Sequence, residues 1–168
     1  MFTQANSVHS FGSPTFALSS QKASKENHRF FVGTCSLHDA NKIHLIEYQE
    51  DSNSIQEVAV YDHKNQVFNI ESSSHDEGLL LTSWLSKTNI RGVTLYRTLD
   101  RDSLTDEMQR DNYNTDIKSL DTIADLDITS NDIISVKWHN TKDRLLTGSS
   151  DKLSTWFIVE SDVKVMSL

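Results

Sequence analysis

The sequence is short of the residues that mark several large classes of protein. Its 168 residues include one cysteine, Cys35, so no disulfide can form within the chain, which fits a reducing compartment. No hydrophobic run approaches 18 residues, so we expect no membrane-spanning helix and no direct membrane insertion. The first residues have no basic stretch followed by an apolar one, so we expect no signal peptide and a cytoplasmic location.

Glycine, proline and positive charge are also scarce. Five glycines and one proline exclude a linker-rich chain, so turns must be made mainly by Asn, Asp and Ser. The 16 Lys and Arg residues are outnumbered by 24 Asp and Glu residues, which gives a net charge of −8. Nucleic acid and anionic lipid attract clustered basic residues, so neither is expected as a partner. Residues 99–127 contain nine acids and three bases, so most of the negative charge belongs to one segment.

What the sequence does contain is a series of short β-type runs. The pattern is plainest near the C-terminal end, where runs at 133–138, 144–149 and 153–159 are separated by polar turn residues. Ile134, Val136 and Trp138 alternate with other residues, as expected for one face of a strand. Three short strands with a Gly-Ser-Ser-Asp corner are typical of a propeller blade in WD-repeat proteins.

Earlier parts of the chain can be read as copies of the same unit. The second strand of each copy begins near residues 30, 79 and 145, so the spacings are about 49 and 66 residues. The larger spacing contains an acidic insert, expected at 99–117, and without it the period is close to the ~40–50 residues of a propeller blade. We therefore predict an all-β partial β-propeller of about three four-stranded antiparallel WD-type blades. Their expected limits are 14–61, 66–126 and 133–168, after a mobile tail at 1–13.

The acidic insert has two interpretations. Most such segments are solvated loops at the edge of a blade, and we favour this interpretation. The alternative is an interaction loop that is phosphorylated at Ser103 or Thr105, where acidic residues follow the hydroxyl.

The sequence has no motif for catalysis, cofactor binding or metal binding. It lacks a nucleophile elbow, a glycine-rich phosphate loop and an H-E-x-x-H helix, so no cofactor and no small-molecule substrate are expected. Cys35 and His38 have ligand spacing, but no second pair completes a zinc site. The run 147–151 sets hydroxyls beside a carboxylate without a base to activate them, which favours a structural role. We therefore predict a protein that is not an enzyme.

Several strings resemble a known family. These are Arg-Phe-Phe-Val-Gly-Thr at 29–34, Ser-Leu at 36–37, Asn41 and Ile-His-Leu-Ile at 43–46, followed by the strands at 66–70 and 79–82. Together they resemble the N-terminal portion of the EARP-interacting protein family of WD-repeat propellers. The resemblance implies a scaffold that binds tethering-complex subunits in endosomal recycling and endosome-to-Golgi vesicle traffic. It also implies a peripheral location at endosomes or the trans-Golgi network.

The resemblance also gives expectations for single residues. It implies that Thr147, Asp151 and Trp156 form the hydrogen-bond set inside the third blade, without the histidine of the usual repeat. Propellers similar to this chain have about seven blades, so we expect a fragment of a longer propeller. The expected partner-binding residues are in loops on one face of the propeller: Asp62, His63, Asn131 and Asp132.

Two other functions stay open at this point. A WD-repeat adaptor could instead serve another complex, as a ubiquitin-ligase substrate receptor or a histone-binding subunit. An enzyme that uses the Ser and Asp residues near 150 is the least favoured alternative.

Overall fold

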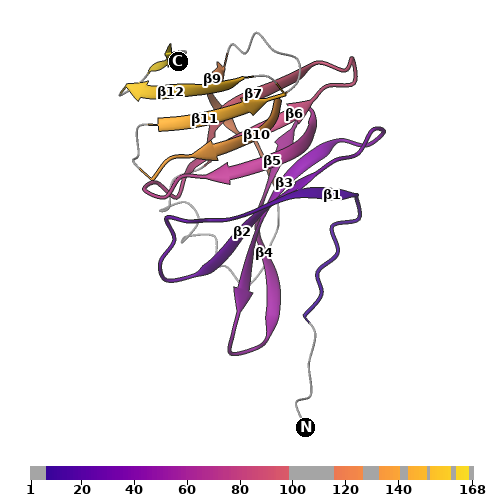
Figure 1. Cartoon of the computed structure of the whole chain (residues 1–168). Helices are drawn as coiled ribbons and strands as arrows, with labels where there is room; N and C mark the ends of the chain where they lie inside the picture. The colour runs from indigo at the N-terminus through magenta and orange to yellow at the C-terminus, as the bar shows by residue number, and fades with distance from the viewer. Residues whose placement is uncertain are drawn as a thin grey trace.

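The computed structural model describes residues 7–98, 116–126, 133–140, 144–150, 152–159 and 162–166. Within these ranges the structure contains β-strands and no helix. The strands form three sheets, so the all-β prediction is confirmed (Figure 1). Sheet 1 contains β1 (Thr15–Ser20), β2 (His28–Thr34), β3 (Asn41–Gln49), β4 (Ser54–His63) and β8 (Ile117–Lys118). Sheet 2 contains β5 (Gln66–Ser72), β6 (Leu79–Leu85), β7 (Arg91–Arg97) and β9 (Asp121–Leu126). Sheet 3 contains β10 (Ile133–Trp138), β11 (Arg144–Ser149), β12 (Leu153–Val159) and β13 (Asp162–Met166).

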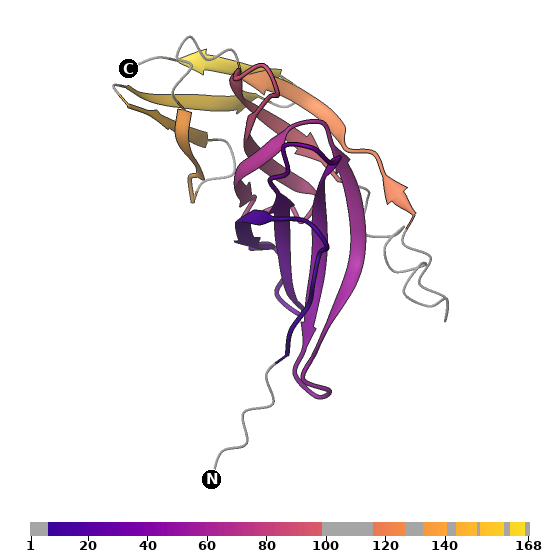
Figure 2. The same cartoon turned by 90° about the vertical axis from the view of Figure 1, so that its right-hand side faces the viewer.

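Sheet 1 departs from the predicted four antiparallel strands. Its first four strands form an antiparallel meander, and β8 then pairs in parallel with β4, with Val60 opposite Ile117. Residues 116–126 thus begin at the outer edge of sheet 1 and continue as β9 at the outer edge of sheet 2 (orange in Figure 2). The sequence analysis placed residue 117 in the acidic insert, because a two-residue strand has no detectable alternation.

The first strand of each sheet carries a β-bulge at the same place. The register shifts between Thr15 and Ala17 in β1, between Val67 and Asn69 in β5, and between Ile133 and Ser135 in β10. A bulge leaves one residue out of the ladder and bends the strand. Phe16, Phe68 and Ile134 are the residues left out. The repeat that the sequence shows as a rough period is therefore present as a matching register.

Two hydrophobic cores join the sheets face to face. The first core lies between sheets 1 and 2, and its buried members include Phe31, Leu45 and Tyr61 from sheet 1 with Ile70 and Leu80 from sheet 2. The sheets approach closely at Gly33, where an added Cβ would lie 2.6 Å from Cγ1 of Val67. The close approach of the Val67 side chain explains why the apolar run of β2 ends in a glycine.

The second core joins sheets 2 and 3. Leu81, Val93 and Leu95 from sheet 2 pack against Trp138 and Trp156 from sheet 3. Sheet 2 therefore contributes both of its faces to packing and lies between the other two, as Figure 1 shows. This accounts for the continuous apolar run at 79–81, since a strand buried on both faces does not alternate.

One buried carboxylate links all three sheets. Glu71 in β5 is 3% exposed and accepts hydrogen bonds from Lys22, which follows β1, and from Lys137 in β10, whose Nζ is 3.1 Å from Oε2. Next to it, the hydroxyl of Ser72 donates to the carbonyl of Ser20 at 2.6 Å. The first strands of the sheets, β1, β5 and β10, therefore lie side by side and are joined by polar contacts as well as by the cores.

Part of the expected N-terminal tail contacts sheet 1. The rings of His9 and Phe11 are 4.9 Å apart, and the ring of Phe11 is 4.9 Å from that of His44 in β3. Nδ1 of His44 is 2.6 Å from a carboxylate oxygen of Glu57 in β4. Residues 1–6 lie outside the described residues, and the mobility of the tail stays a prediction.

Candidate interaction surface

Two of the three residues expected to form the hydrogen-bond set of the third blade, Thr147 and Trp156, lie within the described part of the chain. The indole Nε1 of Trp156 donates to the hydroxyl of Thr147 at 2.9 Å, and both residues are buried. Asp151 lies outside the described residues, so its role stays a prediction. The hydroxyl of Thr147 is occupied by a structural contact, which leaves it poorly placed to act as a nucleophile.

Sheet 2 has a corresponding set that includes a histidine. By register, Thr82 in β6 corresponds to Thr147, and Tyr96 in β7 corresponds to Trp156. Nε2 of His63 is 3.4 Å from the hydroxyl of Thr82, and the ring of His63 meets that of Tyr96 edge-on at 5.6 Å. The sequence analysis considered the histidine of the usual repeat only for the third blade and so missed the one before sheet 2.

The structure corrects the expected position of His63. It is the last residue of β4 and is 3% exposed, so its ring is part of the interior and does not project from a loop. Burial lowers the pKa of His63, although a hydrogen bond to the carbonyl of Asn65 and the charge of Asp62 oppose this shift. Burial likewise raises the pKa of Tyr96, helped by the charge of Asp125 and opposed by a hydrogen bond with Thr94. Both rings are thus kept neutral.

Of the other expected partner-binding residues, one can be placed. Asp62 is exposed at the end of β4, on the same end of the sheets as the start of β5. Asn131 and Asp132 lie outside the described residues. We call this end the start face: it is the end at which β1, β5 and β10 begin, with the connections 35–40, 64–65, 86–90 and 150–152. Partner binding by these residues stays a prediction.

Exposed apolar side chains gather at the start face. Of the seven large apolar side chains exposed in the described residues, four lie there: Phe16, Leu37, Ile90 and Leu153. The ring of Phe16 is 5.4 Å from that of Phe68, and the guanidinium of Arg91 lies 5.8 Å from the centre of the Phe68 ring. Apolar groups gathered at one exposed face mark a site of interaction more often than scattered ones do. The sequence analysis missed the apolar members of this surface because they come from four different strands or connections.

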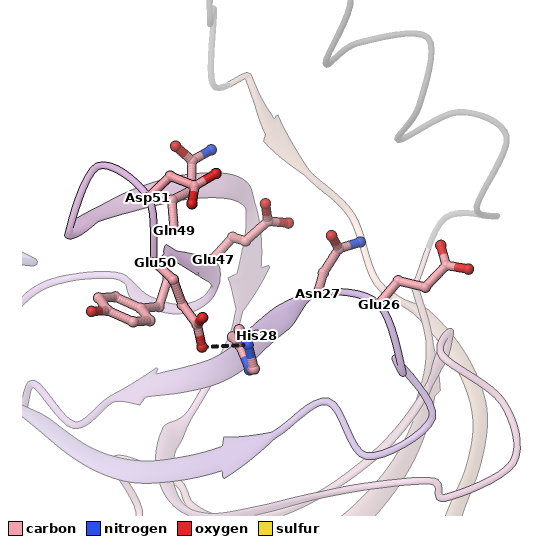
Figure 3. A pocket seen from close by; sticks show the side chains of 8 residues that line it. Glu26, Asn27, His28, Glu47, Gln49, Glu50 and Asp51 are labelled. Carbon is pink, nitrogen blue, oxygen red and sulfur yellow. Dashed lines mark ion pairs between the residues drawn. The ribbon is translucent and has the colours of Figure 1, made fainter.

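The opposite end of the sheets has a different character. We call it the far face, and it includes the connections 21–27, 50–53 and 73–78. A cleft of about 500 Å³ there is lined by Glu26, Asn27, His28, Glu47, Tyr48, Gln49, Glu50 and Asp51 (Figure 3). Glu26 precedes the other three acids by 20 residues or more in the sequence. It meets them because β2 and β3 pair with His28 opposite Tyr48.

The charges that line the far-face cleft are partly neutralised within the chain. Nε of Arg29 is 2.6 Å from a carboxylate oxygen of Glu47, and both residues are buried. His28 and Glu50 form an exposed pair at 3.0 Å, drawn as a dashed line in Figure 3. The first pair stabilises the end of the hairpin, while the second is solvated and contributes little.

The described residues offer little sign of a metal site or a reactive thiol. Among them, no three His, Cys, Asp or Glu side chains lie close enough to share a metal ion. Burial raises the pKa of the Cys35 thiol, which disfavours the reactive thiolate. A search of the same residues found no helix with the length and hydropathy that a membrane crossing requires.

Comparison with known families fits this architecture. A family model described as the EIPR1 beta-propeller matches residues 3–165, which is nearly the whole chain. The chain belongs to the EIPR1 beta-propeller family. Three sheets with matching bulges and two face-to-face cores are therefore parts of a β-propeller, and the predicted fold class and the family resemblance are both confirmed.

Curated relatives are distant and longer. An EARP-interacting protein homolog of Gekko japonicus is 25% identical over 156 residues, which are 89% of this chain and 40% of the relative. Another homolog, from Danio rerio, is 24% identical over 88% of this chain and 40% of its own length. The EARP and GARP complex-interacting protein 1 of Homo sapiens is 24% identical over 86% of this chain and 39% of its own length. The chain thus spans about 40% of the length of the relatives it matches.

Proposed function

We propose that the protein is a non-enzymatic adaptor that binds subunits of endosomal tethering complexes. It would act in endosomal recycling and in endosome-to-Golgi vesicle traffic, in the cytoplasm and at the surface of endosomes or the trans-Golgi network. The observation that carries the proposal is membership of the EIPR1 beta-propeller family, with relatives whose names state interaction with the EARP and GARP complexes.

The described residues support binding over catalysis. The two polar groups that could suggest a reactive site, Thr147 and His63, are both buried. Thr147 is hydrogen-bonded inside sheet 3, and His63 of sheet 1 contacts the hydroxyl of Thr82 in sheet 2. In contrast, the start face presents exposed apolar side chains together with the carboxylate of Asp62. Apolar groups surrounded by polar ones are the usual composition of a protein-binding surface.

We also propose a division of the chain into a tail and three blades. The tail is 1–13, and the blades are 14–61, 66–126 with the acidic insert 99–117, and 133–168. The two cores and the matching bulges support this division. Limited proteolysis tests it: cleavage should begin within 1–13 and 99–117, and early cleavage within 66–98 would contradict it.

The functional proposal is tested by capture of purified complexes. The immobilised full chain should retain purified EARP and GARP complexes, and it should not retain a cullin-based ubiquitin ligase or a histone octamer of equal concentration. Asp62→Lys should weaken retention of the tethering complexes, because it reverses an exposed charge at the proposed surface. Retention of the ligase or the histones in place of the tethering complexes would overturn the proposal.

A further inference from the structure

Three neighbouring edge strands begin at the start face. β1, β5 and β10 are each the terminal strand of their sheet in the described part of the chain, and they lie next to one another. Phe16 and Phe68 are the bulge residues of β1 and β5, so both lie outside the ladder at the same height. Their rings are tilted by 60° at 5.4 Å, a favourable aromatic geometry.

The aromatic pair is accessible to a partner. Phe16 is 69% exposed, although its contact with Phe68 holds it in place. Covering a large exposed ring with a second apolar group lowers the free energy of the complex. A ring that is already held in place also loses little conformational freedom on binding. Ordered and exposed aromatic rings of this kind are preferred at the centres of protein interfaces.

A positioned cation lies beside the pair. Nη1 of Arg91 donates to the carbonyl of Ile133 at 3.0 Å, and the guanidinium lies over the ring of Phe68. These two contacts fix the plane of the guanidinium, which has five N–H donors in all. Within the described residues Arg91 forms no ion pair. The remaining donors are therefore suited to a carboxylate, which a guanidinium can bind through two parallel hydrogen bonds.

We propose that Phe16, Phe68 and Arg91 form a docking site for a peptide segment in which a carboxylate directly adjoins an aromatic side chain. An acidic segment without the ring would leave Phe16 exposed, and an apolar segment without the acid would cover the guanidinium and leave it unpaired. Only the combination satisfies both parts of the site. The inference rests on the proposed function, because it names the chemistry of the partner that the adaptor would bind.

Fluorescence anisotropy with short peptides tests the site. The probe is a fluorescein-labelled Gly-Ser-Asp-Phe-Leu-Ser peptide, and the full chain is the titrant. Two control peptides replace the Asp by Asn or the Phe by Ala. We expect each control peptide to bind about tenfold more weakly, since one charge-assisted contact or one buried ring is lost. Equal binding of the three peptides, or no binding of the first, would overturn the inference.

Variants of the chain locate the binding. Phe16→Ser and Arg91→Lys should each weaken binding of the Asp-Phe peptide by about fivefold or more, because Lys lacks the planar fork and the ring stacking of Arg. Ile117→Ser is the matched control: this side chain is 54% exposed at the outer edge of sheet 1 and outside the site, and its loss should leave binding unchanged. Unfolding temperatures of the variants check that the fold is retained. Unchanged binding by Phe16→Ser would overturn the site.

Two further outcomes separate the possible explanations. Asp132 directly precedes Ile133 in the sequence, and Asp132→Asn tests whether a carboxylate of the chain itself competes with the peptide. Peptide binding by Asp132→Asn alone, and not by the unaltered chain, would show this competition and overturn the docking site. Peptide binding without capture of EARP or GARP would reject the proposed function and keep the site, whereas capture without peptide binding would do the reverse.

Discussion

Trp156 reaches from β12 across to β11 and donates a 2.9 Å hydrogen bond to the hydroxyl of Thr147. Thr147 pairs directly with Ser154, so the indole lies diagonally over the neighbouring strand. Trp156 is 2% exposed and Thr147 is 3% exposed, and neither group can turn to water if the other is removed. This pair therefore fixes the relative positions of two strands inside sheet 3.

Replacing Thr147 by Val should destabilise the chain. The indole N–H would become a buried donor without an acceptor, which costs about 1–3 kcal/mol in the free energy of unfolding. Urea denaturation of the full chain measures the change. Thr155→Val is the matched control, since this threonine of the neighbouring strand β12 is only half-buried.

A second variant shows whether the hydrogen bond itself is responsible. Trp156→Phe removes the donor, and the double variant should lose less stability than the sum of the two single losses. Strict additivity of the two losses would show that the bond does not couple these residues.

Gly33→Ala should destabilise the contact between sheets 1 and 2. The new Cβ would lie within 2.8 Å of two side-chain atoms of Val67, so the sheets must separate or shift, at a cost of about 1–3 kcal/mol. Gly148 is the matched control, because it has the same place beside a bulge and a Cβ there would meet its nearest atom at 4.0 Å. Thermal unfolding of both variants measures the difference.

The explanation for Gly33 can be tested by compensation. Val67→Ala in the Gly33→Ala chain removes the atom closest to the new methyl group and should recover part of the lost stability. A further loss in the double variant, equal to that of Val67→Ala alone, would mean that the two side chains do not clash.

Local patterns predicted the strands well, since alternation and turn residues are properties of neighbouring positions. The interest in Thr147 and Trp156 came from the resemblance to WD-repeat propellers and not from a local pattern, although both residues belong to one hairpin. Local patterns did not predict the parallel pairing of Ile117 with Val60, which joins residues 57 positions apart through a strand of two residues.

The surfaces were harder to predict than the strands. Phe16 and Phe68 meet because two bulges shift the register by one residue each, and no local pattern records a bulge. The acids of the far-face cleft meet only through the pairing of β2 with β3. Both surfaces depend on register between strands, which is fixed by packing of whole sheets.

Loss of both lysines around Glu71 should be far more harmful than loss of either one. Lys137→Met alone leaves Lys22 on the carboxylate and removes a mostly exposed partner, so the cost should stay below about 1 kcal/mol. The double variant with Lys22→Met leaves a buried carboxylate without a cation, which costs about 3–5 kcal/mol. Urea denaturation measures both values.

The loss of stability in the double lysine variant is attributed to the unpaired charge on Glu71, and a substitution can remove this charge. Adding Glu71→Gln to the double lysine variant should restore part of the lost stability, because a neutral amide is cheaper to bury than an unpaired carboxylate. If this third change lowers stability further, the penalty comes from lost packing of the lysine side chains instead.

His63 should make the stability of the chain depend on pH. Nδ1 is 2.7 Å from the carbonyl oxygen of Asn65, so the neutral ring donates there and offers the lone pair of Nε2 to the hydroxyl of Thr82. Burial lowers the pKa of His63 from its ordinary 6.5, so the unfolded chain binds a proton at a higher pH than the folded chain does. The stabilising contribution of the neutral ring is therefore complete above pH 6.5 and is lost as the pH falls toward the lower pKa of the folded state.

His63→Gln isolates this contribution from those of the other titrating groups. At about pH 7.5 the unaltered chain should be more stable than the variant by about 1–2 kcal/mol, because the ring contact with Tyr96 and one buried hydrogen bond are lost. At about pH 5.5 the gap should narrow, since only the unaltered chain must keep a titratable ring uncharged in its interior. His38→Gln, at an exposed position, is measured beside it as the control variant. A gap of constant size across this range would mean that the buried ring of His63 does not couple protonation to folding.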